Sequence, residues 1–566
     1  MFTLPLRAFL EMRELQKHEI LLQSGALRTF RSRMGKAMFI SHQWLTAEHP
    51  DPSGQQFQVL QKALRNLISG RSVVSLPPAV EIAIGRSKCP KATDFQAQQL
   101  YLWYDYFSCP QGEGWAASGS RQLAIASIPT YVERCFFFVI LCPTVSHEDG
   151  KTLGHSTWAD RGWCRLELMA RELQREDGYI ITVREASYPT LAWNSFGVGK
   201  APTRGEFSFE EDREKVGAVL LQMLWSKLHR LVDNGSLPNF RFLLNIHQKY
   251  LEGMNVQPIE GLIPGFSTEL DPYSDEESFV VARFLHDNLF SSISQRDGAG
   301  WSPICYAAIK GDTFLVKALL GKRANPNERL TKQTHDLSKK MPVLSLAVAY
   351  KNNDVVQVLL GARALVNAIC GYGCSPLSWA AMSDNSGAVG ILKEAGADPK
   401  VKKLMATHPF KAACAHGCRE TFQELLAHYP NHSLQYCLHF SLLFFGDSDM
   451  VSCLIEASAD INEQLYISTS RPMWWTLLKL LYIRHTISPS ALTYVAYHHN
   501  GATPLLFSIL TGKYEAAAIL LQAGARVDIR NAQGKTALDL IVEVGAPISL
   551  CKFEDHGADS DDTISI

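Results

Sequence analysis

The stretch Gly300–Asn327, with the sequence GWSPICYAAIKGDTFLVKALLGKRANPN, decides the fold of the C-terminal half because altered copies of it recur along the chain. The copies contain the following prolines: Pro303, Pro342, Pro376, Pro409 and Pro504. A last fragment, GKTALDLIVEVG, starts at Gly534, and the spacing of the phrases settles at about 33 residues. A period of this length is typical of repeat proteins, in which each unit stacks on the next.

Each copy has the composition of a pair of short helices. In Ser302-Pro303 and Thr503-Pro504, the hydroxyl residue can cap the first helix, and proline, which lacks an N–H, fits the first turn. Gly311 ends the first helix, and Leu319-Leu320 supplies the apolar face of the second. One such pair cannot bury its own apolar face, so we expect several pairs to stack into an all-α solenoid.

In these motifs the chain resembles the ankyrin repeat family, from about residue 294 to residue 545. The resemblance implies that the region docks a protein partner on its loop tips and helical surface, while the repeat residues themselves pack. Two segments depart from the pattern: residues 431–462 lack the Thr-Pro start, and residues 463–500 interrupt the period. The interruption is either a degenerate repeat or an inserted helix.

The composition is that of a folded protein without a bias towards nucleic acid or membranes. The 566 residues carry 55 Lys and Arg against 56 Asp and Glu, so no basic field favours nucleic acid or anionic lipid. The longest apolar run, Cys135–Cys142, is too short to span a membrane. Thinly spread cysteines indicate a reducing compartment, and residues 1–33 predict an amphipathic helix without a signal peptide, so we expect a cytoplasmic protein. Residues 546–566 form an acidic tail that we expect to be disordered.

Residues 34–190 alternate short apolar runs with amphipathic stretches, which predicts an α/β domain with a mostly parallel sheet. The expected strands are Ala37–Trp44, Leu100–Phe107, Phe136–Cys142 and Tyr179–Val183, and the expected helices are Gln55–Ile68, Arg121–Cys135 and Arg161–Leu173. Residues 191–293 predict a helical connector to the repeats, with Ser208 and Glu211 as the capping box of one long helix, Gly205–Gly235.

Polar and aromatic residues follow the first two strands, at the edge where ligands bind in sheets of this kind. The expected substrate-binding residues at this edge are Ser41, His42, Trp44, Asp105 and Ser108. The helix after the third strand begins at the same edge and carries Trp163 and Glu167 on one face. We therefore include Trp163 among the candidate binding residues, and a carboxylate near the site is geometrically possible.

Three phrases in this domain resemble the TIR (Toll and interleukin receptor) domain family: FISHQW at Phe39–Trp44, LWYDYFSCPQGEG at Leu102–Gly114 and GWCRLEL at Gly162–Leu168. The resemblance implies a flavodoxin-like parallel sheet and a domain that associates with itself into a homo-oligomer. In enzymatic members, cleavage of NAD depends on the glutamate of the third phrase. The resemblance therefore makes Glu167 a candidate catalytic residue and NAD a candidate substrate, with no bound cofactor. The chain departs from the family in the insertion Arg71–Gln99.

A carboxylate at position 167 would suit that chemistry, because loss of nicotinamide from ribose passes through an oxocarbenium-like state that negative charge stabilises. The alternative is that Glu167 forms a solvated i,i+4 salt bridge with Arg171. Three functions stay open: an interaction scaffold for signalling, an NAD-cleaving signalling enzyme, and a nucleotide-binding protein without turnover. We favour the scaffold.

Two C-x3-C pairs, Cys370 with Cys374 and Cys414 with Cys418, could gather a metal ion together with His416. Cys414 falls where the repeat requires a small buried residue. We therefore expect these cysteines to pack in the core, and we expect no metal site.

Overall fold

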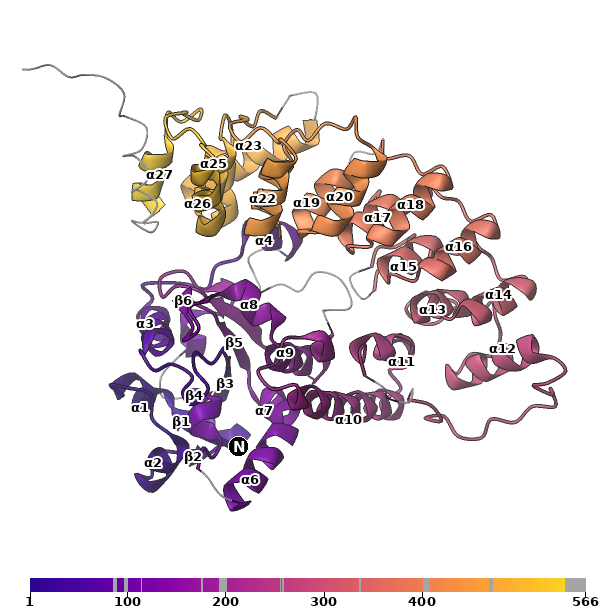
Figure 1. The fold of residues 1–566 in the computed structure, drawn as a ribbon, viewed down its shortest axis with the longest axis horizontal. Coiled ribbons are helices and arrows are strands. Elements are labelled where there is room, and N and C mark those ends of the chain that lie inside the picture. Colours follow the sequence, from indigo (N-terminus) through magenta and orange to yellow (C-terminus); the bar gives the residue numbers. More distant parts are fainter. Residues whose placement is uncertain are drawn as a thin grey trace, which may run out of the picture. The chain divides into compact units, whose positions relative to one another are not determined.

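Figure 1 shows the computed structural model of the chain. The structure describes residues 1–84, 89–95, 100–112, 115–174, 177–192, 201–254, 256, 259–334, 337–400, 408–467 and 472–544. It divides into two units. The first contains residues 1–76, 86–269 and 282–291, and the second contains residues 77–85, 270–281 and 292–566. The acidic tail expected at 546–566 lies outside the described residues.

The first unit is built around a mixed sheet of seven strands in the order β2-β1-β4-β3-β5-β8-β9. The strands are β1 (Phe2–Pro5), β2 (Arg28–Thr29), β3 (Lys36–Ser41), β4 (Leu100–Trp103), β5 (Phe137–Leu141), β8 (Tyr179–Val183) and β9 (Thr190–Leu191). The four central strands β4, β3, β5 and β8 are parallel, and Met38 of β3 pairs with Leu102 of β4 and Phe137 of β5. The expectation of a parallel sheet is confirmed for these strands.

The first two parallel strands are shorter than their apolar runs predict. β3 ends at Ser41, and β4 ends at Trp103 and is followed by the short helix α5 (Asp105–Ser108). The chain turns after β4 because the Asp105 carboxylate accepts a hydrogen bond from the N–H of Tyr106, and the Ser108 hydroxyl accepts one from the N–H of Tyr104. These local bonds replace the sheet ladder.

Helices lie on both sides of this sheet, as Figure 1 shows for α3 and α9. The helices are α3 (Gln55–Ser69), α6 (Trp115–Ala126), α7 (Ile128–Arg134), α8 (His155–Asp160) and α9 (Gly162–Gln174). The predicted helix Arg121–Cys135 is divided between α6 and α7 because Pro129 has no N–H for an intrahelical bond and starts a new first turn. The apolar stripe of α9, with Leu166, Met169 and Ala170, is buried.

The N-terminal segment is not the single amphipathic helix that we expected for residues 1–33. It contains β1 and β2 and two short helices, α1 (Leu6–Glu11) and α2 (His18–Gln23). β1 pairs antiparallel with β4, where Leu4 lies opposite Leu102. Thr3 and Leu4 are fully buried, so pairing with the existing sheet outweighs the helical pattern of the segment.

The connector contains α10 (Glu211–Asp233) and α11 (Leu237–Tyr250) in the first unit, and α12 (Glu276–Asp287) spans the boundary between the units. The long helix starts at Glu211 and not near Gly205, and the predicted capping box is absent. The Ser208 hydroxyl accepts a hydrogen bond from Arg161 instead.

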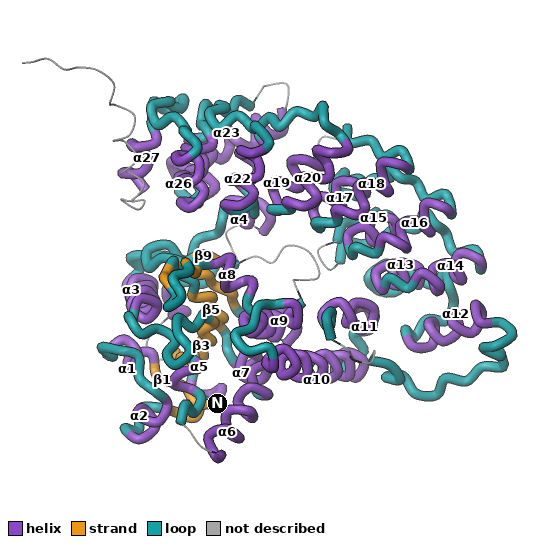
Figure 2. Tube along the Cα trace, in the orientation of Figure 1, coloured by secondary structure: helices purple, strands orange, loops and turns teal. Residues whose placement is uncertain are grey.

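The second unit contains successive pairs of short helices (Figure 2). The pairs are α13 (Pro303–Lys310) with α14 (Thr313–Gly321), α15 (Val343–Ala349) with α16 (Asn353–Gly361), α17 (Pro376–Met382) with α18 (Ser386–Glu394), α19 (Pro409–His416) with α20 (Arg419–His428), α21 (Cys437–Leu443) with α22 (Ser448–Glu456), and α25 (Pro504–Leu510) with α26 (Tyr514–Gln522). A final helix, α27 (Ala537–Val544), follows the last pair. The first helix of each pair is almost entirely buried. The predicted helical solenoid is confirmed.

The caps of the first helices follow the sequence only in part. Thr503 and Ser375 accept a hydrogen bond from the backbone N–H three residues later, as their Thr/Ser-Pro motifs predict. Ser302 does not cap α13, because its hydroxyl interacts with the Cys305 thiol at 3.6 Å. The segment without a Thr-Pro start nevertheless forms the pair α21 and α22.

The interruption at residues 463–500 is helical in the residues that the structure describes. It contains α23 (Pro472–Ile487) and α24 (Ala491–His498), and α23 is about twice as long as the first helices of the repeats. Leu481 of α23 packs on Leu492 and Ala496 of α24. The helix α4 (Pro78–Ile84) belongs to the same unit, and its Glu81 carboxylate accepts a hydrogen bond from the Ser490 hydroxyl at 3.0 Å. The insertion at residues 71–99 therefore contributes a helix to the second unit.

Within the described part of the chain, none of the helices has the length and apolar character needed to cross a membrane.

Candidate functional site

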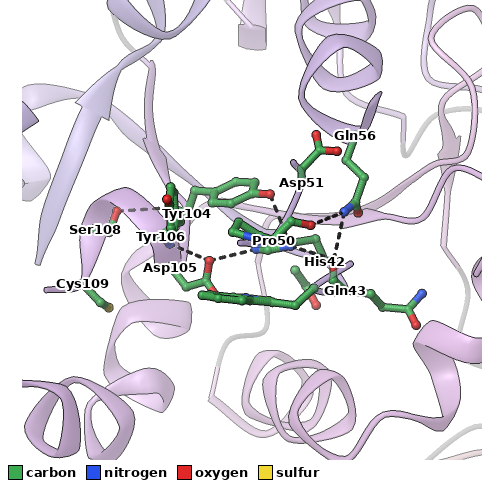
Figure 3. Close-up of polar contacts among 12 residues, drawn as sticks. His42, Gln43, Pro50, Asp51, Gln56, Tyr104, Asp105, Tyr106, Ser108 and Cys109 are labelled. Atoms are coloured by element: carbon green, nitrogen blue, oxygen red, sulfur yellow. Dashed lines mark hydrogen bonds and ion pairs between the residues drawn. The ribbon is translucent and has the colours of Figure 1, made fainter. Parts of the chain in front are cut away.

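A buried His–Asp pair lies where β3 and β4 end, in the first unit (Figure 3). His42 follows β3 and Asp105 follows β4, and the imidazole Nε2 lies 2.9 Å from the carboxylate Oδ1. The side chain of His42 is 2% exposed and that of Asp105 is 35% exposed. The order of the parallel strands reverses at β3, whose neighbours β4 and β5 both follow it in sequence. In open α/β sheets, ligands bind outside the strand ends at such a reversal.

Aromatic side chains hold this pair in place. The indole Nε1 of Trp44 donates to Asp105 Oδ2 at 2.8 Å, and the backbone N–H of Tyr106 donates to Asp105 Oδ1 at 2.6 Å. The ring of Tyr104 stacks on His42 with a centroid separation of 4.0 Å, and the Tyr104 hydroxyl lies 3.3 Å from His42 Nδ1. Both nitrogens of His42 are thus engaged by protein groups.

The pKa values of the pair indicate that both groups carry charge. Burial lowers the pKa of His42, but the negative charge and hydrogen bond of Asp105 outweigh burial, and the pKa is raised overall. Burial likewise raises the pKa of Asp105, and the charge of His42 and the bonds from His42 and Trp44 reverse this effect, so the pKa is lowered overall. These opposite shifts favour the charged form of both groups.

Glu167 of α9 lies next to this pair. Its carboxyl group is hydrogen-bonded to the Ser41 hydroxyl, which also accepts a bond from the indole Nε1 of Trp158 at 3.0 Å. Burial raises the pKa of Glu167 to about 8, and the nearby Asp105 charge adds to the rise. The second carboxyl oxygen, Oε2, is buried and has no hydrogen-bond partner.

The predicted alternative for Glu167, a solvated salt bridge with Arg171, does not describe this environment. Arg171 is 3% exposed, and it donates to the carbonyl oxygens of Cys135 and Asp177. Glu167 is instead bonded to Ser41 at the end of β3.

The structure thus brings five of the predicted site residues together. They are Ser41, His42, Trp44, Asp105 and Glu167. Ser108 is buried beneath the site, where its hydroxyl caps the backbone of Tyr104. Trp163 does not belong to the group, because its indole Nε1 donates to Asp212 of α10 at 3.0 Å. The strand-end rule cannot detect this contact, which depends on the packing of α9 against α10.

Three residues of the site were not predicted from the sequence: Tyr104, Trp158 and Cys164. Cys164 lies one helical turn before Glu167, and its thiol is 3.6 Å from the carbonyl oxygen of His42. Tyr104 directly precedes Asp105, so the strand-end position alone could have suggested it. Nothing in the sequence near Trp158 points to Ser41, since the two residues are 117 positions apart.

Most polar groups of this site are already hydrogen-bonded to other protein groups, which leaves few that could act on a substrate. His42 already uses both ring nitrogens, and Asp105 accepts hydrogen bonds on both oxygens. Among the described residues, no cluster of three or more His, Cys, Asp and Glu side chains is placed to hold a metal ion. Oε2 of Glu167 is a buried polar atom of this site that can bind a further donor or acceptor, and burial raises the pKa of its carboxyl group to about 8.

Comparisons with known proteins bear on the second unit. Residues 304–403 match the family model "Ankyrin repeats (3 copies)", so the C-terminal region contains ankyrin repeats. The chain is 24% identical over 314 residues to the human transient receptor potential cation channel subfamily A member 1. That match covers 47% of this chain and 27% of the human protein, so the chain spans about a quarter of the length of this relative.

Two solved structures are also similar. The human ASB11 ankyrin repeat domain is 25% identical, with 46% of this chain and all of that domain covered and a TM-score of 0.31. The ankyrin repeat domain of Bcl-3, a member of the IkappaB protein family, is 18% identical, with 43% and 94% covered and a TM-score of 0.30.

Proposed function

We propose that this protein is a signalling scaffold of the cytoplasm that docks a protein partner through its ankyrin repeats. The observation that carries the proposal is the stack of helix pairs whose residues 304–403 match the ankyrin family, since repeats of this kind serve protein–protein interaction.

The part of the array between α16 and α17 offers a specific surface for such a partner. Leu365 is 59% exposed and Tyr372 is 40% exposed in this connection, while the flanking helix α17 is buried. Exposed apolar and aromatic side chains on loops of a rigid scaffold favour binding to proteins.

A binding experiment tests this proposal. Proteins retained by the full-length chain from a cell extract are identified, purified and titrated against the chain by interferometry. We expect Leu365→Asp to weaken direct binding about tenfold or more, because a charge at the centre of an interface costs well over 1.4 kcal/mol. Val542→Asp, at an exposed apolar position on α27 (79% exposed), is the control and should bind as the wild type does. Equal affinities for both variants would argue against docking on this surface.

The first unit is proposed to associate with itself, as its resemblance to TIR domains implies. The parallel strand order β4-β3-β5-β8, with the strand reversal at β3, supports the resemblance. Sedimentation velocity of the full-length protein over a range of concentrations tests the self-association. A mass that stays monomeric at the highest concentration would exclude it.

NAD cleavage by Glu167 is the second candidate function. It is favoured by one observation, the burial of Glu167 beside Ser41 and Asp105 with one oxygen unpartnered. The raised pKa of Glu167 argues against NAD cleavage at neutral pH, because a protonated carboxyl group has no charge with which to stabilise a positive oxocarbenium-like state.

The two functions are separated by incubating the purified protein with NAD and following the release of nicotinamide. If Glu167 acts in catalysis, Glu167→Gln should abolish release, whereas Glu172→Gln on the same helix should not. Absence of release by the wild-type protein between pH 6 and about 9, where Glu167 becomes ionised, would exclude NAD cleavage and leave the scaffold and nucleotide binding without turnover.

A further inference from the structure

Three hairpin turns in the repeat array share one backbone geometry. They are the turns Asp297–Trp301, Cys370–Cys374 and Asn531–Lys535. In each turn, the N–H of the first residue donates to the carbonyl of the fifth at 3.0 Å, and the N–H of the fourth donates to the carbonyl of the first at 2.9 Å. The fourth residue is a glycine with a positive φ in all three turns. The differences between them therefore lie in the side chains.

In the first and third turns, an oxygen acceptor occupies the first position. Asp297 Oδ1 accepts hydrogen bonds from the N–H groups of Ala299 and Trp301, both at 3.0 Å. Asn531 Oδ1 accepts equivalent bonds from the third and fifth residues of its own turn, also at 3.0 Å. The backbone of this turn thus directs two N–H groups at one side-chain atom, an arrangement that stabilises negative charge.

In the middle turn, a cysteine sulfur takes the place of that oxygen. The N–H of Cys374 bonds to the sulfur of Cys370. The N–H of Tyr372 is directed at the same sulfur, and it also donates to the Ser338 hydroxyl at 3.2 Å. The side chain of Cys374 bonds to the same sulfur, and Ser338 from the preceding connection adds a further hydrogen bond. The largest of these effects, the bond with Cys374, lowers the pKa of Cys370. Burial opposes it, and the remaining hydrogen bonds lower the pKa further, so the net change is a decrease.

We propose that Cys370 and Cys374 form a redox site, in which a peroxide oxidises Cys370 and Cys374 then closes a disulfide bond across the turn. Both residues are thiols in the structure. The N–H of Cys370 donates to the carbonyl of Cys374 at 3.0 Å, and the two side chains are hydrogen-bonded to each other, so the thiols face each other across the turn. This arrangement suits a disulfide, which requires Cα atoms about 4.4–6.8 Å apart.

The chemistry proceeds in two steps. The Cys370 thiolate attacks one oxygen of hydrogen peroxide, the O–O bond breaks, and the released hydroxide takes up a proton to become water, which leaves a sulfenic acid on Cys370. The sulfur of Cys374 then attacks the sulfenic sulfur, and its proton leaves with the hydroxyl group as a second water. Two thiols lose two electrons in all, and the peroxide is reduced to two waters.

Two observations support this assignment: the tip of the turn is exposed, and a second cysteine pair of the same spacing lies in a different environment. Both sulfur-bearing residues are buried, and Tyr372 at the tip of the turn between them is 40% exposed. The second C-x3-C pair, Cys414 and Cys418, has the same spacing without the turn: Cys414 lies inside α19 and Cys418 follows that helix. Burial raises the pKa of Cys418 to about 12 and that of Cys414 well above its usual range. The thiolate is the reactive form of cysteine, so the two pairs should react very differently.

The test treats the full-length protein with limiting hydrogen peroxide, blocks remaining thiols with an alkylating agent and analyses proteolytic peptides by mass spectrometry. We expect the peptide with Cys370 and Cys374 to lose two hydrogens and to escape alkylation, and dithiothreitol to reverse this. The Cys414–Cys418 peptide in the same digest is the internal control and should stay reduced. Equal oxidation of both pairs, or oxidation only in denaturant, would overturn the proposal.

Two variants distinguish the roles of the cysteines. Cys374→Ser removes the second thiol, and we expect the sulfenic acid on Cys370 to accumulate and to be trapped by dimedone. Cys370→Asp restores the residue type of the first turn, so the turn should stay folded while Cys374 no longer responds to peroxide. Hydrogen exchange of α17 peptides measures folding in both variants. Peroxide sensitivity of Cys374 that survives in folded Cys370→Asp would refute the order of the steps.

Discussion

Replacing Glu167 by glutamine should make the stability of the first unit less sensitive to pH. Between about pH 4.5 and 8, the folded state keeps a proton on Glu167 that the unfolded chain has released, because burial raises the pKa to about 8. Stability therefore falls as pH rises through this window and is greatest below it. Glutamine has nearly the same shape, carries no titratable proton and keeps a group that can bond to Ser41.

The magnitude follows from the shift. Each pKa unit corresponds to about 1.4 kcal/mol, so a rise from the usual value of 4.5 to about 8 corresponds to at most about 5 kcal/mol. The hydrogen bond from Ser41 and the adjacent His42 both favour the charged form, and relaxation of the site reduces the cost further. We therefore expect Glu167→Gln to be more stable than the wild type by about 2–4 kcal/mol at pH 8.5 and nearly equal to it at pH 5.

Calorimetry of the full-length protein from pH 5 to 8.5 measures this effect. Hydrogen exchange of peptides from β3 and β5 identifies which transition belongs to the first unit. Glu11→Gln is the control, because Glu11 lies on the surface in an exposed i,i+4 pair with Arg7 and its loss should change stability by less than about 0.5 kcal/mol at any pH. If Glu167→Gln differs from the wild type by the same amount at pH 5 and 8.5, the carboxyl group is not held protonated in the fold, and the argument fails.

Three further predictions concern single contacts. Asp105→Asn should destabilise the first unit by about 2 kcal/mol or more in denaturant unfolding, because it leaves the charged His42 without its partner. This loss should be largest between about pH 4 and 6.5, since the pKa of Asp105 is lowered and that of His42 is raised, and it should shrink on either side. Thr503→Ala removes a helix cap and should cost about 1 kcal/mol, whereas Ser302→Ala should cost less, because Ser302 makes no cap bond. Leu454→Ala, at a fully buried position of α22, should cost about 2–4 kcal/mol and show faster hydrogen exchange in α22, which a surface position would not.

The repeat array could be predicted from the sequence because its rules are local. Capping residues, proline in the first turn and glycine at the helix end act within a few residues, so each helix pair is specified by its own phrase. The failures were local as well. Ser302 does not cap its helix because its hydroxyl interacts with the Cys305 thiol one turn away. The helix α23 is longer than the repeat helices, and the interrupted period did not predict its length.

The N-terminal unit was predicted less completely because part of its sheet depends on distant contacts. The four parallel strands have apolar runs that are visible in the sequence, but β1 is stabilised by pairing with β4, about 100 residues away. A segment of four residues has no strand signal of its own, and the helical pattern around it dominated the prediction.

The candidate site was predicted where one rule of topology applies. Strand ends of a parallel sheet meet at one edge, and this rule brought His42, Asp105 and Glu167 together although they come from three elements. It could not show which way α9 is rotated. The contact of Trp163 with Asp212 is determined by α10, which belongs to the connector and not to the sheet.

The two cysteine pairs have the same spacing in the sequence but lie in different environments in the structure. A common spacing led to one expectation, core packing, for both pairs, and all four cysteines are buried. Cys414 lies within α19, whereas Cys370 occupies the position that Asp297 and Asn531 occupy in equivalent turns, where the backbone supplies N–H groups to an acceptor. Since the turn is maintained by its glycine and its backbone bonds, the residue at its first position can change without loss of the fold. A sulfur at that position lies in an environment that stabilises an anion, so the proposed reactivity of the pair follows from the geometry of the repeat and not from the spacing of the cysteines.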